Sequence, residues 1–209
     1  MKKWCISNTK PRIFICFIMK NFIEKSAKVH KKAKIYPFVS VLGGSIIEEG
    51  VTIYPYCVII NSVISAGTTV YASHISDSFV GKNCTVGPNA HIREHSYIND
   101  SVRIGNFVEV KKSTIGSHTK AAHLSYIGDA EVGYNTNIGC GVVFCNYDGK
   151  QKHRTTVGNN VFIGSNSNLI APITIADGCF IAAGSTVTKS LEENSFCIER
   201  AEMKVKDKR

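Results

Sequence analysis

Histidine, cysteine and basic side chains are the residues of this chain that could do chemistry. The 209 residues include 7 histidines, 8 cysteines and 25 lysines and arginines. A neutral imidazole near pH 7 can accept a proton from an amine, an arginine can grip two phosphate oxygens at once, and a lysine adds a mobile point charge. One such residue alone usually belongs to a solvated surface, so the elements that hold these side chains must be identified first.

An aliphatic residue at every sixth position is the clearest pattern in the sequence. One register runs from Val80 to Val110 and a second from Val157 to Val187. A period of six fits neither an amphipathic helix nor an alternating strand, and it is typical of a hexapeptide β-solenoid. The inward positions of the two registers are Val80, Val86, Ile92, Ile98, Ile104, Val110, Val157, Ile163, Leu169, Ile175, Ile181 and Val187.

Two further positions of each hexapeptide support a coil of three short strands. The fifth position is small or apolar, as at Cys84, Ala90 and Val161, and we expect it to point into the narrow space near a corner. Glycine often follows the inward aliphatic residue, as at Gly105 and Gly116, where we expect a positive φ and a close approach of two backbones. Strands of such a coil pair with the coils before and after them. The sequence therefore predicts an all-β solenoid.

The repeat divides the chain into three parts. Weaker repeats from Val29 onward predict a solenoid over residues 27–190, preceded by a helical or disordered leader over 1–26. Residues 191–209 form a C-terminal segment with a basic tail. The repeat is interrupted at 146–156, a polar and basic stretch without core residues, which predicts a loop extruded from the solenoid. Loops of this kind on a rigid scaffold tend to carry function.

Composition restricts the partners of the chain. The formal net charge of +9 favours anionic partners such as phosphorylated small molecules. The basic residues do not alternate with aromatic residues, so we expect no nucleic-acid binding. There is no Cys-x-x-Cys pair, and Cys84 and Cys179 fall on inward positions, which favours a reduced, cytoplasmic protein. The apolar run of residues 13–19 is too short to span a membrane, so no membrane insertion is expected.

Four segments of the repeat region have a more specific composition than the hexapeptide requires. They are Gly105-Asn-Phe-Val-Glu-Val-Lys-Lys112, His123-Leu-Ser-Tyr-Ile-Gly-Asp-Ala130, Cys145-Asn-Tyr-Asp-Gly149 and Ile181-Ala-Ala-Gly-Ser-Thr-Val-Thr188. Through them the chain resembles the acetyltransferase domain of the bifunctional glucosamine-1-phosphate N-acetyltransferase / N-acetylglucosamine-1-phosphate uridylyltransferase family. The resemblance implies a left-handed parallel β-helix and homotrimers with active sites at the subunit boundaries. No nucleotidyltransferase motif precedes Ala27, so we expect the uridylyltransferase domain to be missing.

The reaction that the resemblance implies is a direct attack of the 2-amine of glucosamine 1-phosphate on acetyl-CoA, without a metal. Its product is N-acetylglucosamine 1-phosphate, which serves the synthesis of UDP-N-acetylglucosamine, a cell-wall precursor. His123 matches the general base of the family. The matching contacts to the sugar and its phosphate are Arg93, Lys111, Tyr126, Asn137 and Lys152. The chain departs from the family at Arg93, where Ile-Arg-Glu-His replaces the usual Leu-Arg-Pro-Gly.

A second set of positions matches contacts to acetyl-CoA in the family. Asn146 and Tyr147 match residues that line the thioester. Ser165 and Ala183 match positions along the pantetheine arm, and Arg200 matches a residue near the CoA phosphates. Cys140 also belongs to this set and stands where the family usually has alanine.

Three other interpretations remain open. His118 and His123 have the His-x4-His spacing that γ-carbonic anhydrases use for two zinc ligands, but no third histidine occurs near Lys82, and a catalytic zinc normally has three protein ligands. The repeats also permit an acyltransferase for another amino sugar or a nucleotide-sugar. The third interpretation is a non-catalytic scaffold, which would have no use for a base, a phosphate grip and CoA contacts together.

Overall fold

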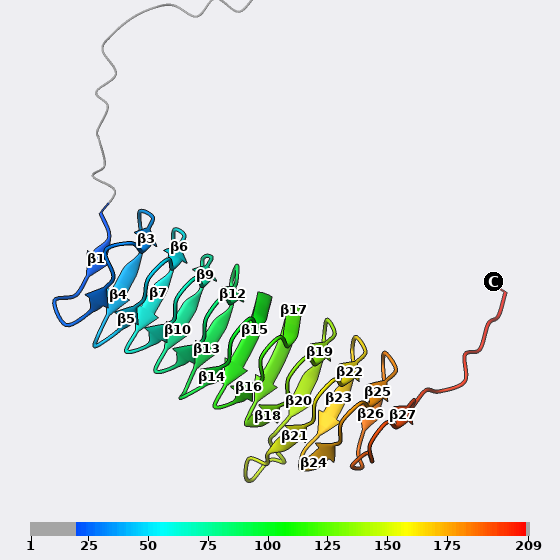
Figure 1. Ribbon diagram of the computed structural model, residues 1–209. Helices are drawn as coiled ribbons and strands as arrows, with labels where there is room; N and C mark the ends of the chain where they lie inside the picture. Colours follow the sequence, from blue (N-terminus) through cyan, green and yellow to red (C-terminus); the bar gives the residue numbers. More distant parts are fainter. Residues whose placement is uncertain (1–19, 208–209) are drawn as a thin grey trace, which may run out of the picture.

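Residues 20–207 are described by the structure, a computed structural model, and they form a left-handed parallel β-helix without an α-helix. Figure 1 shows the coils stacked along one axis from the N-terminal to the C-terminal end. The all-β solenoid that the sequence predicts is confirmed. Nor does this described part contain a helix long and apolar enough to cross a membrane.

Three strands close each coil, so the β-helix has three faces. Face 1 consists of β3 (Lys34–Ile35), β6 (Thr52–Ile53), β9 (Thr69–Val70), β12 (Thr85–Val86), the first parts of β15 (Arg103–Lys111) and β17 (Lys120–Gly128), β19 (Asn137–Ile138), β22 (Phe162–Ile163), β25 (Phe180–Ile181) and β27 (Phe196–Cys197). Face 2 consists of β1 (Phe22–Ile23), β4 (Ser40–Leu42), β7 (Val58–Ile60), β10 (His74–Ser76), β13 (His91–Arg93), the last parts of β15 and β17, β20 (Val143–Cys145), β23 (Asn168–Ile170) and β26 (Thr186–Val187).

Face 3 forms a separate sheet. It consists of β2 (Lys28–Val29), β5 (Ile46–Ile47), β8 (Val63–Ile64), β11 (Phe79–Val80), β14 (Tyr97–Ile98), β16 (Thr114–Ile115), β18 (Ala130–Val132), β21 (Thr155–Val157) and β24 (Ile173–Ile175). We call the turn from face 1 to face 2 corner 1, and the turn from face 2 to face 3 corner 2. These two corners carry the residues of the candidate site.

The pairing register places equivalent residues of neighbouring coils directly against one another. On face 2, Ile92 pairs with Val110, Val110 pairs with Ile127, and all three are fully buried. Every aliphatic residue that the two sequence registers predict to point inward is buried, with at most 3% of its surface exposed. Burial of one such side chain stabilises the fold by roughly 1.5–3 kcal/mol. The inner column of aliphatic residues is therefore the main source of stability.

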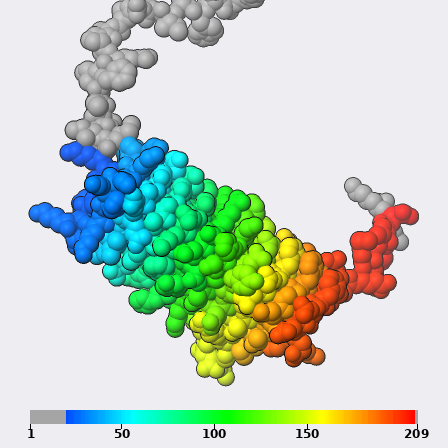
Figure 2. All heavy atoms as spheres, viewed as in Figure 1, coloured from blue at the N-terminus to red at the C-terminus, as the bar shows by residue number. Residues whose placement is uncertain are grey.

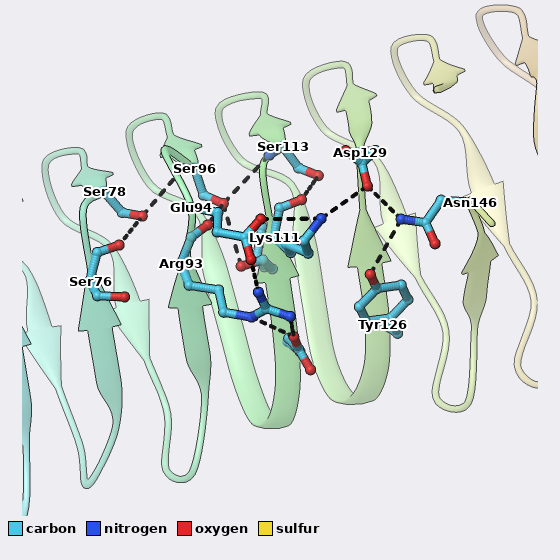
Figure 3. Close-up of polar contacts among 12 residues, drawn as sticks. Ser76, Ser78, Arg93, Glu94, Ser96, Lys111, Ser113, Tyr126, Asp129 and Asn146 are labelled. Atoms are coloured by element: carbon cyan, nitrogen blue, oxygen red, sulfur yellow. Dashed lines mark hydrogen bonds and ion pairs between the residues drawn. The ribbon is translucent and has the colours of Figure 1, made fainter. Parts of the chain in front are cut away.

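A ladder of serine hydroxyls runs along corner 2. The main-chain N–H of Ser62 donates to Ser45 Oγ (3.1 Å), that of Ser78 donates to Ser62 Oγ (3.1 Å), and that of Ser96 donates to Ser78 Oγ (3.2 Å). Figure 3 shows how the ladder continues to Ser113, beside a group of charged residues. The hydroxyls satisfy N–H groups that the turn would otherwise leave unpaired. They therefore fix the geometry of corner 2.

The glycines that follow inward aliphatic residues permit a close approach of backbones, and their φ corrects part of the prediction. Neither Gly105 nor Gly116 has a positive φ. A Cβ at Gly105 would collide with the main-chain carbonyl of Ala122 in the next coil. Gly87, which follows the inward Val86, does have a positive φ, but most of the positive φ values occur later in the turns, at residues such as Asn166, because asparagine tolerates the left-handed region better than most residues.

The β-helix extends beyond both boundaries that the repeat predicts. β1 pairs with β4 although it lies before residue 27, and β27 pairs with β25 although it lies after residue 190. Phe22 and Phe196 are 62% and 65% exposed, so these terminal strands lack the buried aliphatic pattern from which the boundaries were inferred. The predicted leader falls mostly on residues 1–19, which lie outside the described residues.

The polar stretch after β20 leaves the solenoid as a loop. It covers residues 146–154, because β21 begins at Thr155. An antiparallel bridge between Tyr147 and Lys152 closes the loop on itself. Figure 2 shows a yellow-green protrusion from the β-helix at this part of the sequence.

One buried hydroxyl yields a stability prediction. Among the described residues 20–207, the buried side-chain atom without a hydrogen-bond partner is Thr155 Oγ1. Thr155→Val removes this unpaired group and keeps the shape of the side chain. We expect the free energy of unfolding, measured by urea denaturation, to rise by about 1 kcal/mol.

Thr136→Val is the matched control for this prediction. Thr136 Oγ1 donates to the carbonyl of Gly158 (3.0 Å) and accepts from the N–H of Val161 (3.2 Å). The same substitution there should lower the free energy of unfolding by about 1 kcal/mol. Equal effects of the two substitutions would contradict the assignment of Thr155 as an unsatisfied group.

Candidate functional site

Lys111 is a buried cation at the centre of a charged cluster at corner 2. It ends β15, and only 3% of its surface is exposed. Its Nζ lies 3.2 Å from Glu94 Oε2 and 3.3 Å from Asp129 Oδ2, as Figure 3 shows. A buried ammonium needs such partners because its transfer out of water is costly. Lys111 therefore links the coil before it to the coil after it.

Arg93 extends the cluster on the side of β13. The register pairs Arg93 with Lys111, so both side chains start from the same corner. Its Nε and Nη2 both lie 2.8 Å from Glu109 Oε1, and its Nη1 contacts Glu94 Oε1. Glu94 therefore bridges Arg93 and Lys111, with one carboxylate oxygen on each.

The backbone at Glu94 has an uncommon conformation. Glu94 and the following His95 have φ values of 53° and 59°. Few residues other than glycine adopt this left-handed region, and proline cannot, because its ring fixes φ near −65°. A proline at position 94 could therefore not form this turn. It directs the Glu94 carboxylate toward Lys111 (Figure 3).

Asp129 and Asn146 form the opposite side of the cluster. Asn146 Nδ2 donates to Asp129 Oδ2 (2.5 Å) and lies 3.3 Å from the hydroxyl of Tyr126. Asp129 and Asn146 are 7% and 6% exposed. The structure thus joins Tyr126, a predicted sugar contact, and Asn146, a predicted acetyl-CoA contact, to the predicted phosphate contacts.

The loop at 146–154 brings Lys152 to the same cluster. Inside the loop, Asp148 Oδ1 accepts hydrogen bonds from the N–H groups of Lys150 (2.7 Å) and Gln151 (2.8 Å), and Asp148 Oδ2 lies 2.6 Å from His153 Nε2. The N–H of Gln151, then His153, then the N–H of Lys150 hold the pKa of Asp148 well below its usual value. Asp148 is therefore ionised near neutral pH and stabilises the loop that carries Lys152.

The neighbours of Lys111 and Glu94 favour the charged forms of these two groups. Burial lowers the pKa of Lys111, but the nearby Lys152, the hydrogen bonds to Glu94 and Asp129 and the charge of Asp129 raise it more, to well above its usual value. The nearby Lys111, with its positive charge, lowers the pKa of Lys152. Desolvation raises the pKa of Glu94, but the hydrogen bond from Lys111 and the surrounding positive charges lower it more. The cluster thus holds three cations, Arg93, Lys111 and Lys152, and three carboxylates, Glu94, Glu109 and Asp129.

A second group of predicted site residues forms a row along corner 1. Its members stand two residues after paired inward residues of face 1 in four successive coils, and they are His123, Cys140, Ser165 and Ala183. The N–H of Asn166 donates to the carbonyl of Cys140 (2.7 Å), and that of Gly184 donates to the carbonyl of Ser165 (2.7 Å). Arg200 donates to the carbonyl of Ala183 (3.0 Å) and so extends the row toward the C-terminus.

A shallow pocket lies on face 2 between the two groups. Its volume is about 370 Å³, and its lining includes Phe107, Glu109, Leu124, Tyr126 and Val143. Leu124 follows His123 at corner 1, and Tyr126 contacts Asn146 of the charged cluster. At about 3.3 Å per strand residue, the five steps from His123 to Gly128 span roughly 16 Å. The pocket therefore covers the space between a histidine and a set of cations.

Two predicted contact residues lie apart from the others: Asn137 is away from the pocket, and Tyr147 is away from the row on corner 1. Asn137 begins β19 on face 1, where it pairs with Lys120 and Phe162, around corner 1 from the pocket. Tyr147 is 60% exposed on the loop at corner 2, at the opposite end of face 2 from Cys140. One chain therefore brings together the predicted phosphate contacts but leaves the predicted acetyl-CoA contacts in two separate groups.

Sequence reasoning misses the three carboxylates of the cluster. Each of them stands about one coil away in sequence from a cation that the resemblance does identify, and each contacts that cation in the structure. A search for opposite charges at the spacing of one coil would have found Glu94 and Asp129 as partners of Lys111. The single-coil pattern of six residues does not contain this information.

In the described part of the chain, His118 and His123 do not belong to a set of zinc ligands of the kind that a γ-carbonic anhydrase would need. His118 is exposed in the turn between β16 and β17, before the strand that carries His123. Within residues 20–207, no group of three or more histidine, cysteine, aspartate or glutamate side chains could hold a metal ion.

Comparison with protein families identifies two regions of the chain. Residues 154–189 match the model of the bacterial transferase hexapeptide (six repeats). Residues 17–96 match the model of the GMPPB C-terminal domain. The first match includes the part of face 3 that follows the loop, together with Ser165 and Ala183.

Curated relatives cover most of the chain. It is 50% identical over 186 residues to the bifunctional protein GlmU of Clostridium acetobutylicum, which is 89% of this chain and 41% of the relative. It is 51% identical over 180 residues to the bifunctional protein GlmU of a Geobacillus species, which is 86% of this chain and 39% of the relative. The chain thus spans about two fifths of the length of these relatives.

Solved structures with a similar arrangement are more distant. LpxA from Acinetobacter baumannii is 19% identical, with a TM-score of 0.43, and the likeness covers 82% of this chain and 67% of that chain. The UDP-N-acetylglucosamine acyltransferase of Francisella novicida is 18% identical, with a TM-score of 0.48, and the likeness covers 78% and 61% of the two chains. These values are too low to carry an inference about this chain.

The hydrogen bonds of Asp148 are expected to hold the loop in a fixed conformation. Because its folded pKa is lowered, its stabilising contribution is present above the usual aspartate pKa of about 3.9 and is lost only as the pH falls through the folded pKa. At pH 7, Asp148→Asn should therefore speed hydrogen–deuterium exchange at the amides of Lys150 and Gln151 on the order of tenfold.

Asp177→Asn is the matched control for the loop. Asp177 Oδ1 accepts a hydrogen bond from the N–H of Asn159 (2.8 Å) in a turn outside the loop. This substitution should leave exchange at Lys150 and Gln151 unchanged. Unaltered exchange in Asp148→Asn would show that other contacts hold the loop.

Proposed function

We propose that the chain, which is about 50% identical to bifunctional GlmU proteins over about two fifths of their length, is an acetyltransferase of an amino-sugar phosphate. It transfers the acetyl group of acetyl-CoA to the 2-amine of glucosamine 1-phosphate and yields N-acetylglucosamine 1-phosphate for UDP-N-acetylglucosamine synthesis. One observation carries the proposal: Arg93 and Lys111 meet at Glu94 on corner 2, and the pocket of face 2 extends from their side of the face to Leu124, the residue after His123.

The acceptor would lie at the corner 2 end of face 2. Its phosphate would contact the cations of corner 2, which supply charge-assisted hydrogen bonds, and its ring would lie in the pocket beside Tyr126. The amine stands on the ring carbon next to the one that bears the phosphate, so the His123 that receives its proton would be the exposed His123 of a neighbouring copy packed by its corner 1 against this corner 2. Holding the phosphate beside the base converts a reaction between two free molecules into one between oriented groups.

His123 would act as the general base. As the amine nitrogen attacks the thioester carbonyl, a C–N bond forms and the imidazole accepts the proton that the nitrogen loses. The C–S bond then breaks, and the CoA thiolate leaves with a proton returned by the imidazolium. No covalent acetyl-enzyme is needed, so Cys140 and Cys145 have no nucleophilic role in this mechanism.

The row along corner 1 would bind the donor. Cys140, Ser165 and Ala183 are small residues on successive coils, and they leave room for the pantetheine arm to run along the β-helix axis. Arg200 lies at the end of this row, where its guanidinium can contact the CoA phosphates. Acetyl-CoA is thus the co-substrate that we propose, and no residue of this mechanism requires a metal.

A homotrimer would complete the site. The two groups of acetyl-CoA contacts lie at opposite ends of face 2 in one chain, so a neighbouring copy packed against corner 1 could place its own Asn146 and Tyr147 beside His123. Exposed Phe107 and Leu124, which are 59% and 58% exposed on the same face, give such a copy an apolar surface to cover. We therefore propose active sites at the boundaries between subunits, with Asn137 contributed across the same boundary.

The proposed function is tested by acetyl-CoA turnover, followed as thiol release, with three acceptors. These are glucosamine 1-phosphate, glucosamine 6-phosphate and free glucosamine. We expect glucosamine 1-phosphate to have the highest kcat/KM, by roughly 100-fold, because it alone carries a phosphate on the carbon next to the one that bears the amine, so that the cations can hold the phosphate while the amine meets the base. A preference for free glucosamine would favour a second candidate, an acyltransferase for an unphosphorylated amino sugar, with which a charge-balanced cluster is compatible. Absence of turnover with all three would contradict acetyl transfer to glucosamines.

The role of His123 has its own prediction. His123→Ala should lower kcat by on the order of 10²–10⁴-fold, because the attacking amine loses its proton acceptor. The exposed His118 offers a matched control on a different turn, and His118→Ala should leave kcat near the wild-type value. Wild-type turnover in His123→Ala would remove this residue from the mechanism.

A further inference from the structure

Glu94 occupies the place in the cluster where an anion would be expected to bind. Its two carboxylate oxygens contact Arg93 and Lys111 in the manner of two phosphate oxygens (Figure 3). Of the two carboxylates that contact Lys111, Glu94 is the more exposed, with 49% of its side chain accessible against 10% for Asp129. Any ligand that approaches Lys111 from solvent therefore meets Glu94 first.

The charges of the cluster already balance without a ligand. Three cations face three carboxylates, and Lys111 is almost fully buried among them. A phosphate added to this arrangement would lie beside a carboxylate, and two negative charges at that distance repel each other strongly where water is partly excluded. One carboxylate must therefore move away before a phosphate can bind.

The surroundings of the three carboxylates identify the one that moves. Asp129 is buried and is also held by Asn146 at 2.5 Å. Glu109 lies within β15 and receives two contacts from Arg93 at 2.8 Å. Glu94 instead lies on a turn, half exposed, and is held by the same two cations that a phosphate would use. Rotation of its side chain into solvent breaks those two contacts and leaves the strands unchanged.

We propose that Glu94 is a specificity-determining residue, whose carboxylate occupies the phosphate position between Arg93 and Lys111 until a phosphorylated acceptor displaces it. This inference rests on the proposed function. As a consequence, Glu94 weakens the binding of every acceptor that binds through a phosphate and leaves the binding of an acceptor without a phosphate unchanged. Glu94 therefore reduces the ratio of the affinities for phosphorylated and unphosphorylated amino sugars.

The inference is tested first by binding. Titration calorimetry with glucosamine 1-phosphate, in the absence of acetyl-CoA, compares the wild-type chain with Glu94→Gln, which keeps the shape of the side chain and removes its charge. We expect the Kd to fall on the order of tenfold in Glu94→Gln. Glu49→Gln is the matched control, because Glu49 pairs with Lys32 near the N-terminal end and its loss changes the net charge of the chain equally. It should leave the Kd unchanged.

A second measurement separates specificity from general effects on the fold. In the turnover assay, Glu94→Gln should lower the KM for glucosamine 1-phosphate and leave both its kcat and the KM for free glucosamine unchanged. An unchanged or higher Kd and KM for glucosamine 1-phosphate would overturn the role of Glu94 while leaving the acetyltransferase proposal intact. A tighter Kd in a chain that turns over none of the three acceptors would support the role of Glu94 and overturn the proposed function.

Discussion

Hydrogen bonding between successive coils is the constraint on which the rest of this structure depends. Apart from the strands at the two ends of the described β-helix, each strand pairs in parallel with the strands one coil earlier and one coil later. A residue is therefore fixed against its equivalent about 17 or 18 positions away, except across the loop, where Ile138 pairs with Ile163. This pairing stacks aliphatic residues inside and keeps each corner in one line along the axis. Residues far apart in the sequence, such as Arg93, Lys111 and Asp129, become neighbours because their coils are neighbours.

At several places on the surface this pairing stacks aromatic rings on one another. Tyr36, Tyr54 and Tyr71 form one stack, with ring centroids 4.7 and 4.5 Å apart, and Phe162 and Phe180 form another at 4.6 Å. Corner 2 differs, because there the register places opposite charges on adjacent coils. The charges hold one another in place without a ligand. The side chains of the site are therefore held in place before a ligand binds. Because the cations are already paired with carboxylates, they attract an incoming anion less strongly.

The sequence predicts the fold well because the period of six follows directly from the inward positions, all of which are buried. The position of the loop is also predicted, since a polar stretch cannot continue the core. The strands at Phe22 and Phe196 are missed because their pairing uses backbone groups and buries little. Family resemblance predicts the cations of the candidate site, His123, Tyr126, Asn146 and the row that runs from Cys140 to Arg200, but none of the three carboxylates. The carboxylates depend on contacts between coils, and the left-handed turn at Glu94 depends on a backbone conformation that its residue type disfavours.

The coils that precede β13 contribute no residue to the candidate site, and each of them contacts only its immediate neighbours. A solenoid of this kind can gain or lose a coil by duplication or deletion of one repeat, which moves the remaining coils along the axis by about 4.8 Å without changing their internal geometry. The length of the N-terminal half can therefore drift during evolution independently of the chemistry at corners 1 and 2. The number of coils and the residues of the candidate site can therefore change independently of each other.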